Sequence, residues 1–477
     1  MQVVNLPKKL NIVVVGIGPH SKRTYLNFFE KYKICPKLII ELESEKENVS
    51  AFILEKGWNS ILFTIPAEYK DALVLPKQYQ NQLDIICKEK EITHAIIATE
   101  PKGHLMYLDY FLSKKIHTLT DKPIVVFDNM LEFANIKKLR DSYYRLLQSG
   151  NKNTVCKVLC QRNFHKGYEY IRNLIKRIIV EYSIPITYIS IYSCDGNWVM
   201  PHDLNYENHP YKYGYGKTFH SGYHHIDLLI SLLKLNNYTS IEKKIVKAKM
   251  YNSFVTPNDE LDIICLSDYK ILFNNEKFPD FYDKQDFNFL NYGEKDIFSQ
   301  IEFTNLNNRI ITIANLNLLE SGFSRRGWLH TKEDRYKGNG RVRHESLNIQ
   351  LGPLLNIQIH SYQSKEIKDR TTKEIDFGGL DHFDIDIYRN TELIGGQPYE
   401  RIRTTDFYDF SKEKYFKGLN EMGREDAIKS FIYLKEDEND LINQKNSMEL
   451  LYQCCLSYYY YKNNKDRIRE FPFNLNT

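Results

Sequence analysis

The sequence predicts a two-domain α/β protein, with a parallel, doubly wound sheet followed by an α+β domain built on a large, mostly antiparallel open sheet. The chain has 477 residues, more than one compact core ordinarily holds. Over the first 150 residues, apolar runs alternate with helix-like stretches, which is typical of a parallel sheet with crossover helices. Beyond Leu347, apolar and polar side chains alternate, as in strands with one exposed face. We therefore expect domains at 1–150 and 151–477.

The expected elements follow from these patterns in chain order. In the first domain, the strand-like runs are Ile12–Val15, Leu38–Ile40, Ile61–Phe63, Ala95–Ile97 and Ile124–Val126, and the helix-like runs include Lys22–Tyr32 and Leu105–Leu112. The second domain has an enlarged, strand-rich region at about 285–405 and closing helices at about 426–462. Its clearest strand patterns are LNIQLGPLLNIQIHSY from Leu347 and HFDIDIYR from His382. The exposed face of this sheet is a candidate contact for a homo-oligomer.

Composition excludes several functional classes. The 65 basic and 61 acidic side chains give a net charge of +4, which is too balanced for a nucleic-acid footprint. No apolar run is long enough for a signal peptide or a membrane span, so we expect a cytoplasmic protein without a membrane partner. The 8 cysteines include no CxxC pair, which favours buried free thiols over a disulfide framework or a zinc site.

The run NIVVVGIGPHSKR, from Asn11 to Arg23, predicts a dinucleotide-binding turn of the Rossmann type. Gly16 allows a tight bend, and Gly18 lets the backbone approach a pyrophosphate at the N-terminus of the next helix. The third glycine position of the usual fingerprint holds Ser21, which is also small. The expected cofactor contacts in this turn are Gly16, Ile17, Gly18, Pro19 and His20.

An acidic residue follows the second strand run at the distance expected for a ribose contact. Glu41 lies about 20 residues beyond the glycine turn, and Glu43 lies two residues further on the same face. A carboxylate there would repel a 2′-phosphate, which favours NAD, although the nearby Lys22 and Arg23 do not exclude NADP. Alternatively, both glutamates belong to an exposed helix start, ELESEKE.

A family resemblance begins at Ala98, with ATEPKGHLMYLDYFLSKKIHTLTDKPI. Its threonine and proline before a histidine, followed by Asp-Lys-Pro, resemble the Gfo/Idh/MocA oxidoreductases, whose usual second element is Glu-Lys-Pro. Aspartate here replaces the glutamate. The resemblance implies NAD(P) as cofactor and a catalytic lysine, and it assigns these residues to the cofactor site: Thr99, Pro101, His104, Asp121 and Lys122.

A second block, GYGKTFHSGYHHIDLLISLL from Gly214, resembles the Asp-x-x-x-His-x-x-Asp signature of the same family. By this resemblance, His224 is the catalytic histidine, Asp227 is the following acid and a substrate contact, and His220 replaces the usual aspartate. His220 is then either catalytic or only a substrate contact. The segment QRNF, at 161–164, resembles the strand that opens the second domain, and its Arg162 is a candidate for substrate binding or for the domain junction.

These residues suit an NAD(P)-dependent dehydrogenase or reductase acting on the CH–OH group of a sugar, sugar derivative or cyclitol. Such a site needs a base near neutrality and a cation beside the developing alkoxide. The histidines and Lys122 meet these needs, and sequence alone leaves open which group carries the proton. Two alternatives share the fold: an NAD-retaining glycosidase or lyase, and a non-catalytic regulator that senses a dinucleotide.

Five of the 14 histidines lie close together, which raises the possibility of a metal site. His220 and His224 are four residues apart, a spacing that zinc uses, but Gly222 lies between them and no nearby cysteine or glutamate completes the ligand set. We therefore predict no metal. Ordinary structural or surface roles are expected for the other three, His202, His209 and His225.

The basic segment Ser324–Glu345 has seven Lys or Arg against three acids, with three glycines, and is expected to form a loop. Arg325 and Arg341 are candidates to bind an anionic sugar derivative, because guanidinium groups match phosphate and carboxylate oxygens. A solvated arm or a subunit contact is the alternative.

Overall fold

The computed structural model describes the chain apart from residues 1–6, 8, 150–152, 197, 199–200, 206–209, 273–286, 323–340, 366–381, 408–417 and 476–477. It divides into two compact units. Unit 1 comprises residues 1–127, 137–165 and 420–448, and unit 2 comprises residues 128–136, 166–419 and 449–477. The division differs from the expected boundary near residue 150, because a segment close to the C-terminus packs into unit 1.

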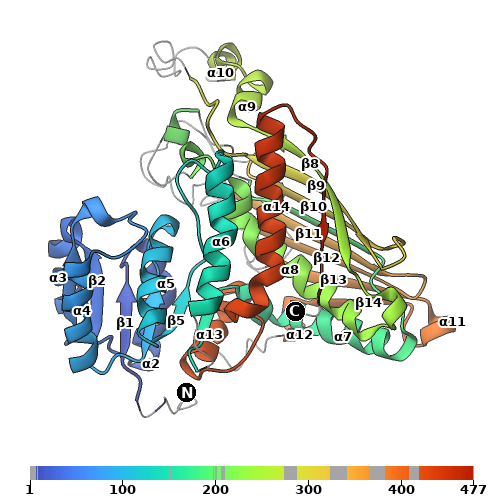
Figure 1. Cartoon of the computed structure of the whole chain (residues 1–477). Helices are drawn as coiled ribbons and strands as arrows, with labels where there is room; N and C mark the ends of the chain where they lie inside the picture. Colours follow the sequence, from blue (N-terminus) through green and yellow to red (C-terminus); the bar gives the residue numbers. More distant parts are fainter. Residues whose placement is uncertain are drawn as a thin grey trace. The chain divides into compact units, whose positions relative to one another are not determined.

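Unit 1 is built on a six-stranded, fully parallel sheet with the order β3-β2-β1-β4-β5-β6 (Figure 1). The two central strands are fully buried and, except for His94, apolar, as expected for a sheet covered on both faces. This confirms the parallel α/β domain. The strands are β1 Ile12–Val15, β2 Leu38–Leu42, β3 Ile61–Ile65, β4 His94–Ile97, β5 His117–Thr120 and β6 Cys156–Val158.

Helices connect the strands of unit 1. A continuous helical run follows β1 and comprises α1 Pro19–Ser21, a π-helical turn η1 Lys22–Leu26 and α2 Asn27–Tyr32. The other helices are α3 Lys46–Glu55, α4 Lys77–Glu89, α5 His104–Ser113, α6 Phe133–Ser149 and α13 Leu419–Ile432. Although α13 is remote in sequence, its Ala427 and Phe431 pack into the same core as Ile12 and Tyr25. That packing explains why the C-terminal segment belongs to unit 1.

One expected strand of unit 1 is wrong. The run Ile124–Val126 is buried but forms no strand, whereas His117–Thr120, which was not expected, forms β5. The position beside β5 is taken by β6, which pairs Thr118 with Cys156. Burial alone therefore accounts for the apolar character of Ile124–Val126.

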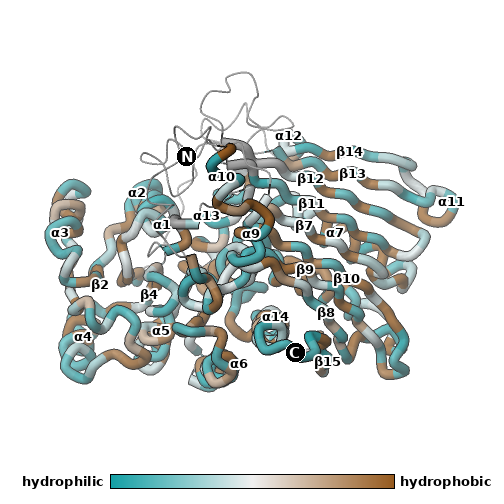
Figure 2. The backbone as a smooth tube through the Cα atoms, turned by 90° about the horizontal axis from the view of Figure 1, so that it is seen from above, coloured by the Kyte–Doolittle hydropathy of each residue, from teal (hydrophilic) through white to brown (hydrophobic). Residues whose placement is uncertain are grey.

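Unit 2 is built on a nine-stranded sheet with the order β14-β13-β12-β11-β7-β10-β9-β8-β15. It is antiparallel except for the parallel pair β7 and β10, which confirms the expected mostly antiparallel sheet. Its strands are β7 Tyr188–Cys194, β8 Lys247–Val255, β9 Asp296–Thr304, β10 Ile310–Leu319, β11 Arg341–Leu351, β12 Leu355–Lys365, β13 His382–Arg389, β14 Tyr399–Arg403 and β15 Arg469–Pro472. Hydrophilic and hydrophobic positions alternate along these strands in Figure 2, because one face is buried and the other is not.

Unit 2 contains two long helices and several shorter ones. They are α7 Lys166–Tyr182 and α14 Lys445–Lys462, and shorter helices are α8 Tyr223–Leu233, α9 Pro257–Ile263, α10 Leu266–Leu272, α11 Thr391–Ile394 and α12 Thr404–Phe407. A π-helical turn, η8 Thr218–Gly222, leads directly into α8. Among the helices of the described residues, none is long and apolar enough to cross a membrane.

Two further expectations need correction. The segment QRNF forms a 3-10 helix, η5 Gln161–Phe164, in unit 1 rather than a strand that opens the second domain. Residues 341–345, the end of the expected basic loop, are part of β11 and pair with β12, and residues 324–340 lie outside the described residues. Strand pairing satisfies the backbone of this charged stretch, which composition alone suggested was irregular.

Candidate functional site

The glycine turn after β1 has the geometry that a dinucleotide requires. Gly16 has φ of +88°, and a Cβ at this position would lie 2.9 Å from the carbonyl oxygen of Ala98, so no other residue fits without strain. A Cβ on Gly18 would meet no atom within 4 Å, which leaves open space beside the first turn of the helix. Ser21 is fully buried, as close packing of the third small residue requires. The turn therefore fits a pyrophosphate.

Of the two expected acidic residues, Glu41 is the one that reaches the turn. It lies in β2, and the backbone N–H groups of Leu42 and Ile17 contact its carboxylate. Burial raises the pKa of Glu41 to about 7, although these N–H groups act in the opposite direction. Glu43 lies in the 3-10 turn η2 Glu43–Glu45. The sequence had left the choice between the two glutamates open, and the contact with Ile17 favours Glu41.

The TDKP segment follows β5 and is tied to the glycine turn. Asp121 accepts a hydrogen bond from the hydroxyl of Tyr25 at 2.8 Å, and its other oxygen lies 3.3 Å from Nε2 of His20. Burial would raise the pKa of Asp121, but the His20 ring and the hydrogen bonds from His20 and Tyr25 hold it below its usual range. Asp121 and His20, both expected at the cofactor, therefore lie side by side and contact each other. Lys122 follows directly, half-buried, in a cis peptide bond with Pro123.

His104, in the first turn of α5, contacts two backbone carbonyl groups of the same region. Its Nδ1 lies 2.8 Å from the carbonyl oxygen of Pro123, and its Nε2 lies 3.1 Å from the carbonyl oxygen of Thr99. Burial lowers the pKa of His104, so the neutral ring donates to only one of the two oxygens at a time. The ring connects the TEP turn, where Pro101 begins a 3-10 helix, with the carbonyl of Pro123, the residue after Lys122. Thr99, Pro101, His104 and Lys122 are thus brought together in unit 1.

In unit 2, a π-helical turn carries His220 and leads into the helix that carries His224 in its first turn. Close backbone packing on the sheet explains the glycines of this segment. A Cβ on Gly216 would lie 1.8 Å from the carbonyl oxygen of Glu294, and a Cβ on Gly222 would lie 2.8 Å from a side-chain carbon of Leu318. His220 is exposed and His224 is half-buried.

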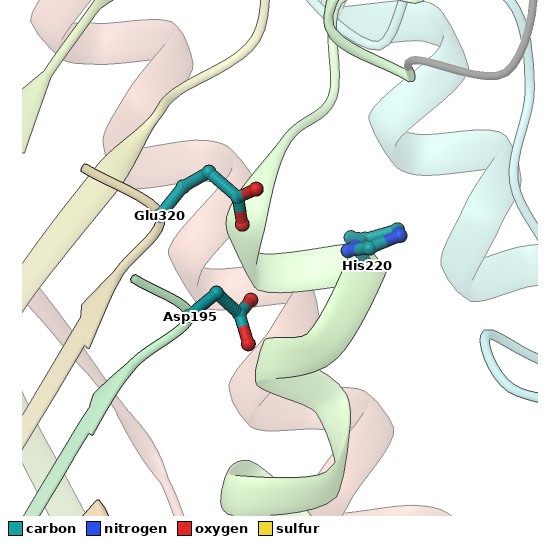
Figure 3. A group of neighbouring side chains, drawn as sticks. All are labelled: Asp195, His220 and Glu320. Atoms are coloured by element: carbon teal, nitrogen blue, oxygen red, sulfur yellow. The ribbon is translucent and has the colours of Figure 1, made fainter. Parts of the chain in front are cut away.

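Two carboxylates that sequence reasoning missed face His220. Asp195 follows β7 and Glu320 follows β10, and these neighbouring strands are parallel, so their carboxyl ends meet at one edge of the sheet. Both residues are buried. One ligand atom from each of Asp195, His220 and Glu320 lies within 4.8 Å of the others, and the ring points toward the two acids in Figure 3. No motif in the sequence signals this group, because it depends on the single parallel pair in the sheet.

The contacts of Asp195 argue against a metal ion at this group. One of its oxygens accepts a hydrogen bond from Nζ of Lys217 and a second one, at 2.6 Å, from Oγ of Ser221. The other accepts from Nε of Arg343 at 3.1 Å, and a second guanidinium nitrogen lies at the same distance. These four donors occupy the four lone-pair sites of a carboxylate. Asp195 therefore anchors the π-helical turn to β11 and has no lone pair directed at a cation.

The remaining predicted substrate residues belong to different elements of the two units. Asp227 is buried one turn beyond His224 in α8, and Arg162 is buried in η5 of unit 1. Arg341 lies in β11, whereas Arg325 lies outside the described residues. Among the other histidines, His225 contacts Glu345 at 3.6 Å in the interior of unit 2, which fits a structural role. His202 lies in a 3-10 helix, and His209 is outside the described residues.

No family model and no curated protein matches the chain. Solved structures do match it along its whole length. Levoglucosan dehydrogenase, in complex with NADH and levoglucosan, has a TM-score of 0.57 and 11% identity, and the match covers 98% of this chain and 99% of that one. The WlbA dehydrogenase from Bordetella pertussis, in complex with NADH and UDP-GlcNAcA, has a TM-score of 0.54, 11% identity and coverages of 98% and 99%.

A third match is apo scyllo-inositol dehydrogenase from Lactobacillus casei, with a TM-score of 0.50, 12% identity and coverage of 98% of both chains. At such low identity these likenesses establish the fold. They agree with the parallel sheet of unit 1, the large sheet of unit 2 and the expected resemblance. The chain has the fold of the Gfo/Idh/MocA-type oxidoreductases.

Proposed function

We propose that this protein is an NAD-dependent oxidoreductase that transfers hydride between the nicotinamide and a CH–OH group of a sugar, sugar derivative or cyclitol. The observation that carries the proposal is the glycine turn of unit 1, where open space beside Gly18 adjoins a helix start and the Glu41 carboxylate. The fold is shared with dehydrogenases whose structures contain NADH together with a sugar or a nucleotide sugar.

The residues of unit 1 suit the cofactor in a specific way. The amides of the first helical turn after Gly18 bind the pyrophosphate, and Glu41 accepts hydrogen bonds from the adenosine ribose hydroxyls. The carboxylate disfavours a 2′-phosphate, so NAD is the preferred cofactor over NADP. When bound, NAD would be the acceptor of the hydride, which carries two electrons.

The remaining catalytic roles are assigned to residues of both units. Lys122, which precedes the Pro123 carbonyl that His104 contacts, stabilises the negative charge that develops on the substrate oxygen. We assign His224 to the reacting centre together with Lys122, and we assign His220 to contact with the substrate. Oxidation of the alcohol releases one proton to a basic side chain of this set as the C–H hydrogen leaves with its electron pair.

A cofactor-coupled absorbance screen against sugars, nucleotide sugars and inositols tests the proposal. With an active substrate in hand, we expect Lys122→Ala and His224→Ala each to lower kcat/KM by about 10²–10⁴-fold while NADH binding is retained. Lys114→Ala, at an ion pair with Asp84 on the surface of the same unit, is the matched control and should leave kcat/KM unchanged.

Three outcomes would argue against this assignment. Absence of NADH binding would reject the cofactor site. NADH binding without oxidation or reduction of any compound in the panel would favour a regulator. Nicotinamide retained through purification, with no net change in its absorbance during turnover, would instead favour an enzyme that oxidises its substrate only transiently.

A further inference from the structure

The group formed by Asp195, His220 and Glu320 contains two carboxylates with different surroundings, and this difference separates their roles. The four donors around Asp195 come from Lys217, Ser221 and Arg343, and two of these side chains are cations. The charge of Asp195 is thereby compensated, and its position is fixed. Asp195 is a positioning residue for the turn that carries His220.

Glu320 differs because its position is set through its backbone. Its N–H lies 2.8 Å from Oδ1 of Asp296 and 3.2 Å from the carbonyl oxygen of Lys295. These contacts fix the start of the Glu320 side chain, which extends toward His220 (Figure 3). The side chain is 4% exposed, so its carboxylate acts in a low-dielectric environment.

Acidic side chains lie near Glu320, and burial raises the pKa of two of them, Glu260 and Asp296. Asp195, Glu260, Asp296 and Glu320 all act on the buried hydroxyl of Tyr211, and burial together with these acids raises the pKa of that hydroxyl. The buried ammonium groups in this region are Lys217 at Asp195 and Lys295, which lies 3.5 Å from Glu260. A carboxylate oxygen of Glu320 lies within 4.8 Å of an imidazole nitrogen of His220, and a carboxylate at that distance favours a positive charge on the ring.

We propose that Glu320 is the carboxylate partner of His220 and that this pair accepts the proton in alcohol oxidation. The inference rests on the proposed function and specifies which group takes the proton. The substrate O–H bond breaks and its proton passes to an imidazole nitrogen of His220, while the C–H electron pair leaves as hydride to NAD and the C=O bond forms. Glu320 stabilises the resulting imidazolium, as a buried carboxylate does behind a catalytic histidine.

Exposure is consistent with this division. The exposed ring of His220 is accessible to a substrate, whereas Glu320 lies behind it in the interior. The sequence placed a histidine where the resembling family has an aspartate on the helix. The structure supplies a carboxylate to the same neighbourhood from the sheet, at the end of β10.

A test that needs no substrate measures the reaction of His220 with diethyl pyrocarbonate, which acylates the neutral imidazole but not the imidazolium. Peptide mass spectrometry follows the rate at pH 6 in the full-length protein. Glu320→Gln removes the charge that favours the imidazolium, so His220 should react roughly 3- to 10-fold faster. Glu302→Gln, the same change on β9, is the matched control, and His20 of unit 1 provides an internal reference.

An unchanged rate for His220 in Glu320→Gln would overturn the proposal. If that variant does not fold, Glu320→Asp replaces it, because the shorter side chain moves the carboxylate away from His220. The modification rate of His220 should then rise by a smaller factor. An unchanged rate in Glu320→Asp would contradict the pairing. With an active substrate, the acid limb of kcat/KM in Glu320→Gln should move to lower pH. Because the modification rate is independent of turnover, failure of the substrate screen and failure of this pairing are distinguishable.

Discussion

At the scale of single residues, Glu41 is the group that we propose to set the cofactor preference of unit 1. Glu41 contacts the backbone of Ile17 in the glycine turn, and burial raises its pKa to about 7. A carboxyl group whose pKa lies near neutrality changes charge within the physiological range. Its repulsion of a 2′-phosphate therefore depends on pH.

We predict that the preference for NADH over NADPH grows as pH rises through the pKa of Glu41. Below it the carboxyl group is protonated and repels the 2′-phosphate little, and above it the carboxylate repels that group fully. The ratio of the two dissociation constants should increase several-fold between about pH 6 and about pH 8. Nicotinamide fluorescence titrations measure both constants. The increase should disappear in Glu41→Gln and persist in Glu43→Gln, and the reverse result would assign the ribose contact to Glu43.

A second prediction at the scale of single residues concerns the buried pair of Lys217 and Asp195. Both side chains are at most 1% exposed, so removal of Asp195 leaves the Lys217 ammonium buried without its anion, whereas removal of Lys217 leaves Asp195 paired with Arg343. Asp195→Asn should lower the free energy of unfolding of unit 2 by about 3–5 kcal/mol, and Lys217→Met should lower it by less. The double variant should recover much of the loss seen in Asp195→Asn, because no lone buried ammonium remains.

Urea denaturation followed by hydrogen exchange of peptides from β7 and η8 measures the effect. Lys31→Met, at the more exposed ion pair with Glu425 in unit 1, is the comparison and should cost less than about 1 kcal/mol. Additive losses in the double variant would show that the two buried charges do not depend on each other.

At the scale of elements, the turn between β1 and α1 contains one glycine that the fold requires, Gly16, and one that we propose to be functional, Gly18. Gly16 has a positive φ and lies against Ala98, whereas Gly18 has extended backbone and open space around its α-carbon. The first is required by the fold of the chain. The second is required only if a ligand approaches the backbone.

Alanine substitutions should therefore have opposite signatures. Gly16→Ala should lower the free energy of unfolding by roughly 1–3 kcal/mol, because an alanine is strained at that φ and its Cβ meets the Ala98 carbonyl. Gly18→Ala should leave thermal stability unchanged and weaken NADH binding at least about tenfold, which corresponds to 1.4 kcal/mol. Thermal unfolding and calorimetric titration measure the two effects. Normal NADH affinity in Gly18→Ala would place the cofactor elsewhere.

The elements also show which sequence patterns are reliable. Ile12–Val15 and His382–Arg389 form strands with the expected bounds, because strong apolar or alternating patterns next to turn residues match strand geometry. Ile124–Val126 has the same apolar character but forms no strand, since β6 occupies the adjacent position in the sheet. A short apolar run reports burial, and hydrogen-bonding partners decide whether it becomes a strand.

At the scale of the whole molecule, the sequence predicts the fold better than the site. Local motifs identify the glycine turn, Lys122 and the histidine segment, because each depends on residues close in the chain. Asp195 and Glu320 are 25 and 100 positions away from His220, and only the parallel pairing of β7 with β10 places them together. A sheet expected to be mostly antiparallel offers no reason to anticipate that edge.

At the scale of the whole molecule, the proposed reaction requires residues from both units to act on one substrate. Lys122 belongs to unit 1, and His220, His224 and Glu320 belong to unit 2. The most direct test is a crystal structure of the full chain grown with NADH. We predict the pyrophosphate at Gly18, and the Lys122 ammonium and the histidines of unit 2 beside the nicotinamide ring. NADH bound at the turn with its nicotinamide remote from Lys122, or from the histidines of unit 2, would contradict the proposed enzyme.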